Sequence, residues 1–405
     1  MRFSSHYKMN NDDIIDYVFE HTDFFSSNEN LICEEIGDGN INYVYRVSDT
    51  KTKKSLVLKQ ADIQTRVRPD GYLNPDRSVR EAKMLKLQFK YAPEFVPKIL
   101  YSDSVMASII MEDIGAYSNL KKELMKASVF HNLGKLISDF IVRTTLPLTV
   151  LVSGYEKKSE LATTFYNPEL CKITEELVFT HPYNDVCKRN ILFAQNAEWL
   201  SARFYNNNEL AAAAAKLKEK FCSNSQSLIH GDLHSGSIFV NDSDCVSETV
   251  TKLKIIDPEF VFYGPIGYDL GNVLAHFILA ETYIAYAANE ITQTKKNDFL
   301  VWIHKTKKEL FENFYMCGIT YLKDNITDAA YKNSIFIRAY IEQLLLDAVG
   351  FCGAELNRRV IGSAKSAEIT SIKNAALRIQ VERALVDTGI WMMLNPEKAV
   401  KEICK

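Results

Sequence analysis

The eight cysteines of this 405-residue sequence include no C-x-x-C pair, so the usual ligand spacing of a structural zinc site is missing. They are also too few, in a chain of this length, to form a disulfide framework. The first 20 residues lack the apolar stretch of a secretory signal. We therefore expect a reduced, cytoplasmic protein whose thiols act as small core residues.

Charge of one sign is not in excess either. Lysine and arginine number 48 against 51 aspartates and glutamates, a formal net charge of −3. Proteins that bind nucleic acid or a membrane surface usually carry a strongly basic face, so we expect neither partner. The most apolar stretch, residues 270–288, is interrupted by Asn272, His276 and Glu281. It predicts a buried helix in a globular protein, not a membrane span.

Two regions of the chain differ in their pattern. Residues 1–115 carry strand-like segments at 31–47 and 55–61, one helix from Arg77 to about Lys90, and another apolar strand before Gly115. From residue 116 onward helical spacing dominates, interrupted by a strand-rich segment at 228–262, and it covers the ranges 119–145, 155–165, 168–180, 184–195 and 201–221. The pattern predicts an α+β protein with a small β-rich lobe at 1–115 and a large, mainly helical lobe at 116–405.

The strand-rich segment carries three carboxylates in a suggestive order. Asp232 lies in a loop before the apolar strand 238–240, and a second apolar strand ends at Asp257. A hairpin would bring both to the same side of a sheet, and Glu259 would share the face of Asp257 on an extended segment. Such carboxylates suit a site for Mg²⁺ and phosphate, in which one accepts a hydroxyl proton. The alternative is a hairpin whose acids cap turns or face solvent.

The first region supplies further candidate groups. Lys59 lies in an apolar strand, where a lysine needs a partner, and Glu81 on the following helix could be that partner. The alternative is an edge lysine whose charged end reaches solvent. A glycine-rich turn, whose backbone N–H groups could approach phosphates, lies between two strand-like segments; a plain hairpin turn is its alternative. This turn consists of Gly37, Asp38, Gly39 and Asn40.

Glycine turn, strand lysine and helix glutamate follow one another in the order found in protein kinases. The segment after the last apolar strand falls where the adenine-binding hinge of such a protein would lie; it contains Met111, Glu112 and Ile114.

Two motifs carry a resemblance to a known family. IHGDLHSGSIFV (229–240) and IIDPE (255–259) resemble the aminoglycoside-phosphotransferase and choline-kinase branch of the protein-kinase-like fold. Within that branch the sequence is similar to the 5-methylthioribose kinases. This chain has Ser237 where the wider branch has asparagine, and Asp257-Pro258-Glu259 where protein kinases have Asp-Phe-Gly. Both departures, and a twin arginine such as Arg358-Arg359, are typical of the 5-methylthioribose kinases. The resemblance covers nearly the whole chain, and the loop at 62–75 departs most from it.

The resemblance implies a two-lobe fold and an ATP-dependent kinase that phosphorylates the 1-hydroxyl of 5-methylthioribose in methionine salvage. It implies that Asp232 is the catalytic base, that Asp257 and Glu259 hold Mg²⁺, and that Lys59, oriented by Glu81, binds the α- and β-phosphates of ATP. The backbone at 37–40 would cover the phosphates and the hinge at 111–114 would bind adenine. The sugar would lie against Asp232, His234, Arg358 and Arg359. Members of this family often form homodimers.

Other interpretations remain open at this point. The same fold could phosphorylate choline, homoserine, an aminoglycoside or another sugar. A kinase-like scaffold that binds nucleotide without turnover would be expected to lack one of its four key residues, yet all are present: Lys59, Asp232, Asp257 and Glu259. Without the resemblance, the twin arginine would be a solvated basic turn after a helix. Asp269 is a candidate brace for the loop that carries Asp232.

Overall fold

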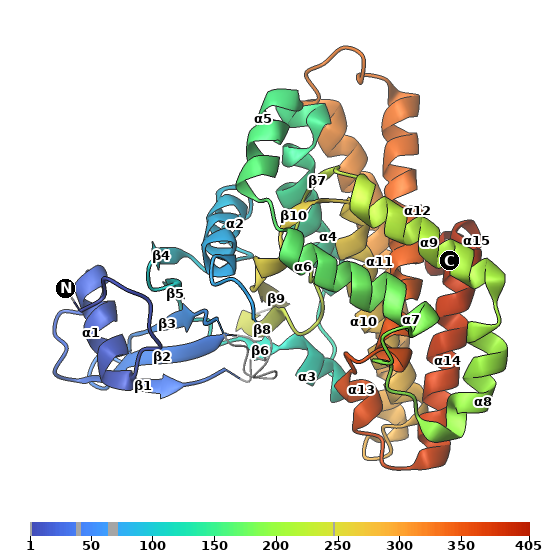
Figure 1. The fold of residues 1–405 in the computed structure, drawn as a ribbon, viewed down its shortest axis with the longest axis horizontal. Coiled ribbons are helices and arrows are strands. Elements are labelled where there is room, and N and C mark those ends of the chain that lie inside the picture. The colour runs from blue at the N-terminus through green and yellow to red at the C-terminus, as the bar shows by residue number, and fades with distance from the viewer. Residues whose placement is uncertain (1, 38–41, 64–71, 246–247) are drawn as a thin grey trace. The chain divides into compact units, whose positions relative to one another are not determined.

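The computed structural model describes residues 2–37, 42–63, 72–245 and 248–405 (Figure 1). The chain divides into two compact units. Unit 1 consists of Met1–Tyr117 with Lys254–Val261, and unit 2 consists of Ser118–Leu253 with Phe262–Lys405. The functional domains expected at 1–115 and 116–405 stay a prediction. The expected α+β class is confirmed, because unit 1 is built around a sheet and unit 2 mainly from helices.

Unit 1 contains a five-stranded antiparallel sheet in the order β1-β2-β3-β5-β4. The strands predicted within 31–47, at 55–61 and before Gly115 are present, and β4 is an additional strand that was not predicted. Their bounds are Leu31–Glu35 for β1, Tyr43–Asp49 for β2, Ser55–Gln60 for β3, Ile99–Asp103 for β4 and Ser108–Glu112 for β5. The glycine-rich turn therefore connects two antiparallel neighbours, β1 and β2.

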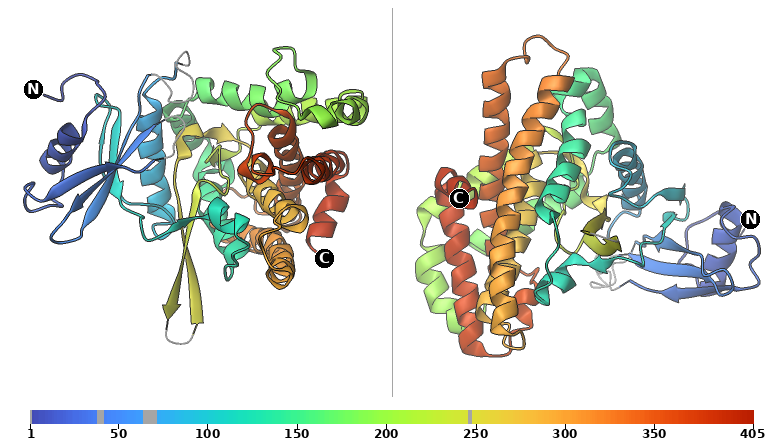
Figure 2. Two further views of the ribbon diagram at one scale, coloured as in Figure 1. Left: turned by 90° about the horizontal axis from the view of Figure 1, so that it is seen from below. Right: turned by 180° about the vertical axis from the view of Figure 1, so that it is seen from behind.

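One helix covers each face of this sheet (Figure 2, left). Leu56 and Leu58 of β3 pack in the same cluster as α1 (Asn11–His21), whereas Val57 packs with α2 (Arg77–Tyr91). Successive side chains of a strand point to opposite faces. Lys59 therefore shares the face of Val57, toward α2, and this alternation is what directs its side chain to the helix.

The segment Lys254–Val261 joins unit 1 through its own hydrogen bonds. The amide of Ile255 donates to the carbonyl of Phe95 at 2.7 Å, and Lys254 Nζ donates to the carbonyl of Val96 at 2.9 Å. The extended course expected from Asp257 to Glu259 is wrong. Asp257 is left-handed, with φ 66° and ψ 44°, and the 3-10 helix η5 (Pro258–Phe260) follows. Aspartate tolerates this conformation, and proline suits the first helical position.

Two small sheets lie in unit 2. Strand β7 (Ser227–Ile229) pairs antiparallel with β10 (Phe262–Gly264). The second sheet has the order β6-β8-β9, with bounds Ser118–Asn119, Ile238–Cys245 and Glu248–Ile255. Neighbouring strands β8 and β9 confirm the hairpin predicted from the two apolar strands.

Helices make up most of unit 2. The longer ones are α4 (Leu133–Thr145), α5 (Val150–Thr164), α9 (Asn208–Ser223), α10 (Ile266–Tyr286), α11 (Gln293–Asn325), α12 (Ser334–Ile361) and α14 (Ala375–Leu394). Shorter ones are α3 (Leu120–Met125), α6 (Pro168–Thr174), α7 (His181–Asn184), α8 (Ala197–Leu200), α13 (Ala367–Thr370) and α15 (Pro396–Ile403). Within the described ranges no single helix has the length and apolar composition of a membrane span; only the pair Leu133–Leu148 and Val150–Thr164, bent by 65°, meets that test together.

The helix predicted over 184–195 is wrong. Helix α7 ends at Asn184, and Asp185 is left-handed with φ 34°. The Asp185 carboxylate accepts hydrogen bonds from the amides of Arg189 and Asn190, at 2.8 and 2.9 Å. A short acidic side chain that captures nearby N–H groups competes with helix formation, which explains the break. The single helix expected over 119–145 is likewise divided, into α3 and α4.

Helix α10 confirms the buried apolar helix expected near 270–288, and its close approach to α12 depends on glycine (Figure 1). A Cβ on Gly271 would collide with the carbonyl oxygen of Ala348 and would lie 2.9 Å from the amide nitrogen of Cys352. Both atoms belong to the rigid backbone of α12. The two helices can therefore pack at this distance only because residue 271 lacks a side chain.

We predict that Gly271→Ala lowers the free energy of unfolding by about 1–3 kcal/mol, because the added methyl forces α10 and α12 apart. The matched control is Gly318→Ala in α11, whose new Cβ would lie 2.9 Å from the flexible end of the Ile341 side chain. Urea unfolding of both variants is the measurement. Equal stability of the two variants would contradict this account of the α10–α12 contact.

Candidate functional site

Lys59 is the centre of a buried ion cluster in unit 1. Its Nζ donates to Glu81 Oε1 at 2.9 Å and forms a second ion pair with Asp257 Oδ1. Only 6% of Lys59 and 1% of Glu81 are exposed. The predicted pairing of strand lysine with helix glutamate is confirmed, and the alternative of an edge lysine in solvent is wrong.

The charge of Lys59 is fixed by its neighbours. Burial opposes the charged form of the ammonium, but the carboxylates of Asp257 and Glu81 outweigh this effect and raise the pKa of Lys59. Lys59 is therefore protonated throughout the physiological pH range. A permanent positive charge with three N–H donors suits the oxygens of a nucleotide's phosphates.

Glu259 is held by two residues that the sequence analysis missed. Its Oε2 accepts a hydrogen bond from Asn42 Nδ2 at 2.9 Å and lies 3.6 Å from Nε of the buried Arg77. Asn42 Oδ1 in turn accepts from Arg77 at 2.9 Å. A signal for Arg77 existed in the sequence, since it precedes Glu81 by four residues and so lies on the same face of α2.

Asp257 and Glu259 are the candidate metal ligands. No group of three or more histidine, cysteine, aspartate or glutamate side chains that could hold a metal occurs in the part of the chain that the structure describes. Magnesium at nucleotide sites, however, takes one or two carboxylates and completes its shell with phosphate oxygens and water. The Asp257 side chain is 46% exposed, so its carboxylate has room for such a partner. The donor chemistry of the pair fits Mg²⁺, and the binding itself stays a prediction.

The glycine-rich turn is described only at its first residue. The amide of Ile36 donates to the carbonyl of Val44 at 2.9 Å, and a Cβ on Gly37 would lie 2.9 Å from that of Val44. This close approach of β1 and β2 requires a glycine. Asp38, Gly39 and Asn40 lie outside the described residues, and the role of this turn stays a prediction.

The expected adenine hinge follows β5. Met111 is buried against the α2 face of the sheet. Glu112 Oε2 accepts from the amide of Lys98 at 3.1 Å and lies 3.3 Å from Lys254 Nζ. Ile114 is half-buried in the loop that follows. Adenine binding by this segment stays a prediction.

In unit 2, the loop that carries Asp232 is braced by Asp269 from the first turn of α10. The amides of His230 and Gly231 donate to the two carboxylate oxygens of Asp269 at 2.6 and 2.9 Å, and Gly231 is left-handed with φ 80°. The predicted brace is confirmed. Burial raises the pKa of Asp269 to about 6, while His230 and the backbone N–H groups oppose the rise.

Asp232 itself is half-exposed, with its carboxylate 3.5 Å from His234 Nε2. Ser237, which stands where the wider branch has asparagine, donates to the carbonyl of Asp232 at 3.2 Å. Burial lowers the pKa of His234 to about 4. His234 is therefore a neutral imidazole near neutral pH, beside an acid that is open to solvent.

The twin arginine lies in the last turn of α12, with Arg359 buried and Arg358 largely so. The side chains of Arg358 and Arg359 are 12% and 9% exposed, and both contact Glu355. Burial acts to lower the pKa of Arg358, but Glu355, Tyr268 and Asp232 together outweigh this effect and raise it. Arg358 and Asp232 thus belong to one electrostatic cluster. The alternative of a solvated basic turn is wrong.

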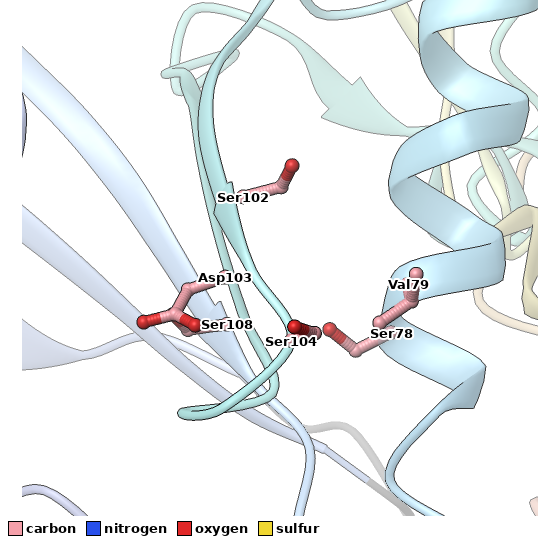
Figure 3. A pocket seen from close by; sticks show the side chains of 6 residues that line it. All are labelled: Ser78, Val79, Ser102, Asp103, Ser104 and Ser108. Atoms are coloured by element: carbon pink, nitrogen blue, oxygen red, sulfur yellow. The ribbon is translucent and has the colours of Figure 1, made fainter. Parts of the chain in front are cut away.

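One hollow of the described surface is lined by residues outside these clusters. This hollow of about 190 Å³ in unit 1 is lined by α2, β4, β5 and the turn between the two strands (Figure 3). Its lining residues are Ser78, Val79, Ser102, Asp103, Ser104 and Ser108. None of the predicted site residues lines this hollow.

The ion cluster of unit 1 gives a stability prediction. Lys59→Met leaves Glu81 buried without its cation, so the free energy of unfolding should fall by about 3–5 kcal/mol. Adding Glu81→Leu should restore most of the loss. Denaturant unfolding measures both variants, with Lys83→Met on the exposed face of α2 as the control for loss of one charge. Full stability of the single variant would contradict the buried pairing.

Comparisons with known proteins bear on the family of this chain. Residues 174–294 match the family model described as "Phosphotransferase enzyme family". The chain is 34% identical to the methylthioribose kinase of Geobacillus sp. (strain WCH70), over 92% of this chain and 89% of that protein. It is also 34% identical to that of Bacillus pumilus (strain SAFR-032), over 89% and 86%. The solved structure of Plasmodium vivax ethanolamine kinase is 14% identical with a TM-score of 0.48, and the match covers 99% of this chain and 91% of that one.

Similarity to the two bacterial enzymes covers about nine-tenths of the chain and so extends through both units. It is not confined to the region matched by the family model. The chain belongs to the methylthioribose kinase family, and it is a small-molecule kinase.

Proposed function

We propose that this protein transfers the γ-phosphoryl group of ATP to the 1-hydroxyl of 5-methylthioribose, giving 5-methylthioribose 1-phosphate in methionine salvage. The observation that carries the proposal is the buried arginine pair in one electrostatic cluster with Asp232, in a chain 34% identical to a methylthioribose kinase over 92% of its length. Phosphoryl transfer needs mainly positioning and neutralisation of charge, which such a cluster supplies.

Unit 1 takes the nucleotide in this proposal. Lys59, oriented by Glu81, binds the α- and β-phosphates, and the backbone of residues 37–40 covers them. Adenine binds at the segment 111–114. Asp257 and Glu259 hold Mg²⁺, which neutralises charge on the β- and γ-phosphates when bound. The fixed charge of Lys59 and the exposed carboxylate of Asp257 support these assignments.

Unit 2 takes the sugar. Asp232 accepts the proton of the 1-hydroxyl; because an anomeric hydroxyl is more acidic than an ordinary alcohol, this task is modest. His234, as a neutral imidazole, offers one donor and one acceptor to the sugar. Arg358 and Arg359 bind the moving phosphoryl group, since a guanidinium matches phosphate oxygens and keeps its charge at any physiological pH.

The assembly and location are also part of the proposal. We infer a cytoplasmic homodimer that binds neither nucleic acid nor membrane. Seven cysteines of the described chain are free thiols, which supports a reducing compartment. The near balance of charge supports the absence of a polyanionic partner.

We predict that ADP release with Mg-ATP occurs with methylthioribose and not with ribose, choline, homoserine or an aminoglycoside. Asp232→Ala should lower kcat by about 10²–10⁴-fold, because it removes the proton acceptor, and should leave ATP binding intact. The matched control is Asp298→Ala, an exposed aspartate of α11, which should keep full activity.

Any other result of this assay would favour a different function. Turnover with another acceptor would keep the site and replace the substrate. ATP binding without turnover on any acceptor would favour a scaffold. Loss of ATP binding in Asp232→Ala would contradict its assignment to the acceptor.

A further inference from the structure

Glu355 on α12 is a buried carboxylate shared by the two arginines. Its Oε1 accepts from Arg359 Nε at 2.6 Å, and its Oε2 accepts from Arg358 at 3.1 Å. Only 1% of Glu355 is exposed. Residues three and four positions apart share one face of a helix, so one glutamate can hold both guanidinium groups. Although burial raises the pKa of Glu355, Arg358 and Arg359 lower it well below its usual range, and the carboxylate is ionised.

The two arginines carry more N–H donors than Glu355 alone can satisfy, although the Asp232 carboxylate also acts on Arg358. Two guanidinium groups face one carboxylate, and each guanidinium carries five N–H donors. Within the described residues, Nε of Arg358 is buried and has no hydrogen-bond partner. A purely structural pair would bury matched charges, because unmet donors are costly. The surplus suits an anion, such as the oxygens of a phosphoryl group.

Glu355 is also tied to the loop of Asp232 through His276 of α10. His276 Nδ1 lies 2.9 Å from Ser235 Oγ, and its Nε2 lies 3.9 Å from Glu355 Oε1. The ring of His276 packs on that of His234, with centroids 5.0 Å apart. His276 of α10 therefore lies between the Asp232 loop and the Glu355 carboxylate of α12. Through this contact the position of the arginines depends on that of the loop.

We infer that Glu355 is a positioning residue that holds Arg358 and Arg359 in register with the Asp232 loop; this inference rests on the proposed function. Both carboxylate oxygens are used by the guanidinium groups, so Glu355 acts through the arginines and does not touch substrate. Without its charge the two adjacent cations repel each other, and their N–H groups no longer converge on one phosphoryl group.

The test is Glu355→Gln, with Glu342→Gln on the exposed face of the same helix as the control for loss of one charge. Misplacement of catalytic groups should lower kcat by about 10²-fold while the KM for ATP stays nearly constant. Glu355→Asp keeps the charge on a shorter side chain and should recover part of kcat. Full activity of Glu355→Gln, or an equal loss in Glu342→Gln, would overturn the inference.

A second readout separates this inference from the proposed function. Phenylglyoxal labels accessible arginines, and peptide mass spectrometry can report the labelling rate of Arg358 and Arg359. Both should react severalfold faster in Glu355→Gln and in Glu355→Asp than in the unmodified protein. If the unmodified protein phosphorylates no acceptor, the proposed function fails. The labelling rates still test whether Glu355 holds Arg358 and Arg359. Equal labelling rates in all three proteins would overturn the inference.

Discussion

A buried charge must keep its partner, and this constraint organises both units. In unit 1 the ammonium of Lys59 lies between the carboxylates of Glu81 and Asp257. In unit 2 the carboxylate of Glu355 lies between the guanidinium groups of Arg358 and Arg359. Removing one member of such a cluster leaves an uncompensated charge in a dry environment, which costs several kcal/mol. The helices that carry these residues are therefore held in place by the same groups to which we assign the chemistry.

The two clusters have opposite imbalance, and that difference matches different tasks. Lys59 is outnumbered by carboxylates, one of which is partly open to solvent and fits a metal ion with phosphates. Glu355 is outnumbered by arginines, one of which keeps a buried N–H group unused within the described chain. An exposed carboxylate suits a cation, and an unused N–H group suits the oxygens of a phosphoryl group. In the phosphoryl transfer that we propose, the carboxylates of unit 1 therefore serve the metal and the arginines of unit 2 serve the phosphoryl group.

How much could be predicted from the sequence depended on the range of each contact. The pair of Lys59 and Glu81 was predicted because a lysine in an apolar strand needs a partner and Glu81 lies on the helix that follows. A role for the arginine pair was expected only from the resemblance, because an isolated Arg-Arg sequence is more often a solvated turn, and its burial was not predicted. Contacts between distant segments leave little local signal: helix spacing puts Arg77 on the face of Glu81, but nothing in the sequence indicates that Asn42 contacts Glu259. The bend at Asp257 and the break at Asp185 are single-residue left-handed conformations, which periodicity does not reveal.

The central claim is that the phosphoryl group goes to the anomeric oxygen of a methylthio sugar, and the product can be identified directly. Phosphorus NMR of a reaction with methylthioribose and Mg-ATP reports which proton couples to the new phosphate. We predict a single phosphomonoester coupled to the anomeric proton, formed in equal amount to ADP. A phosphate on another oxygen, or ADP with inorganic phosphate alone, would contradict the account.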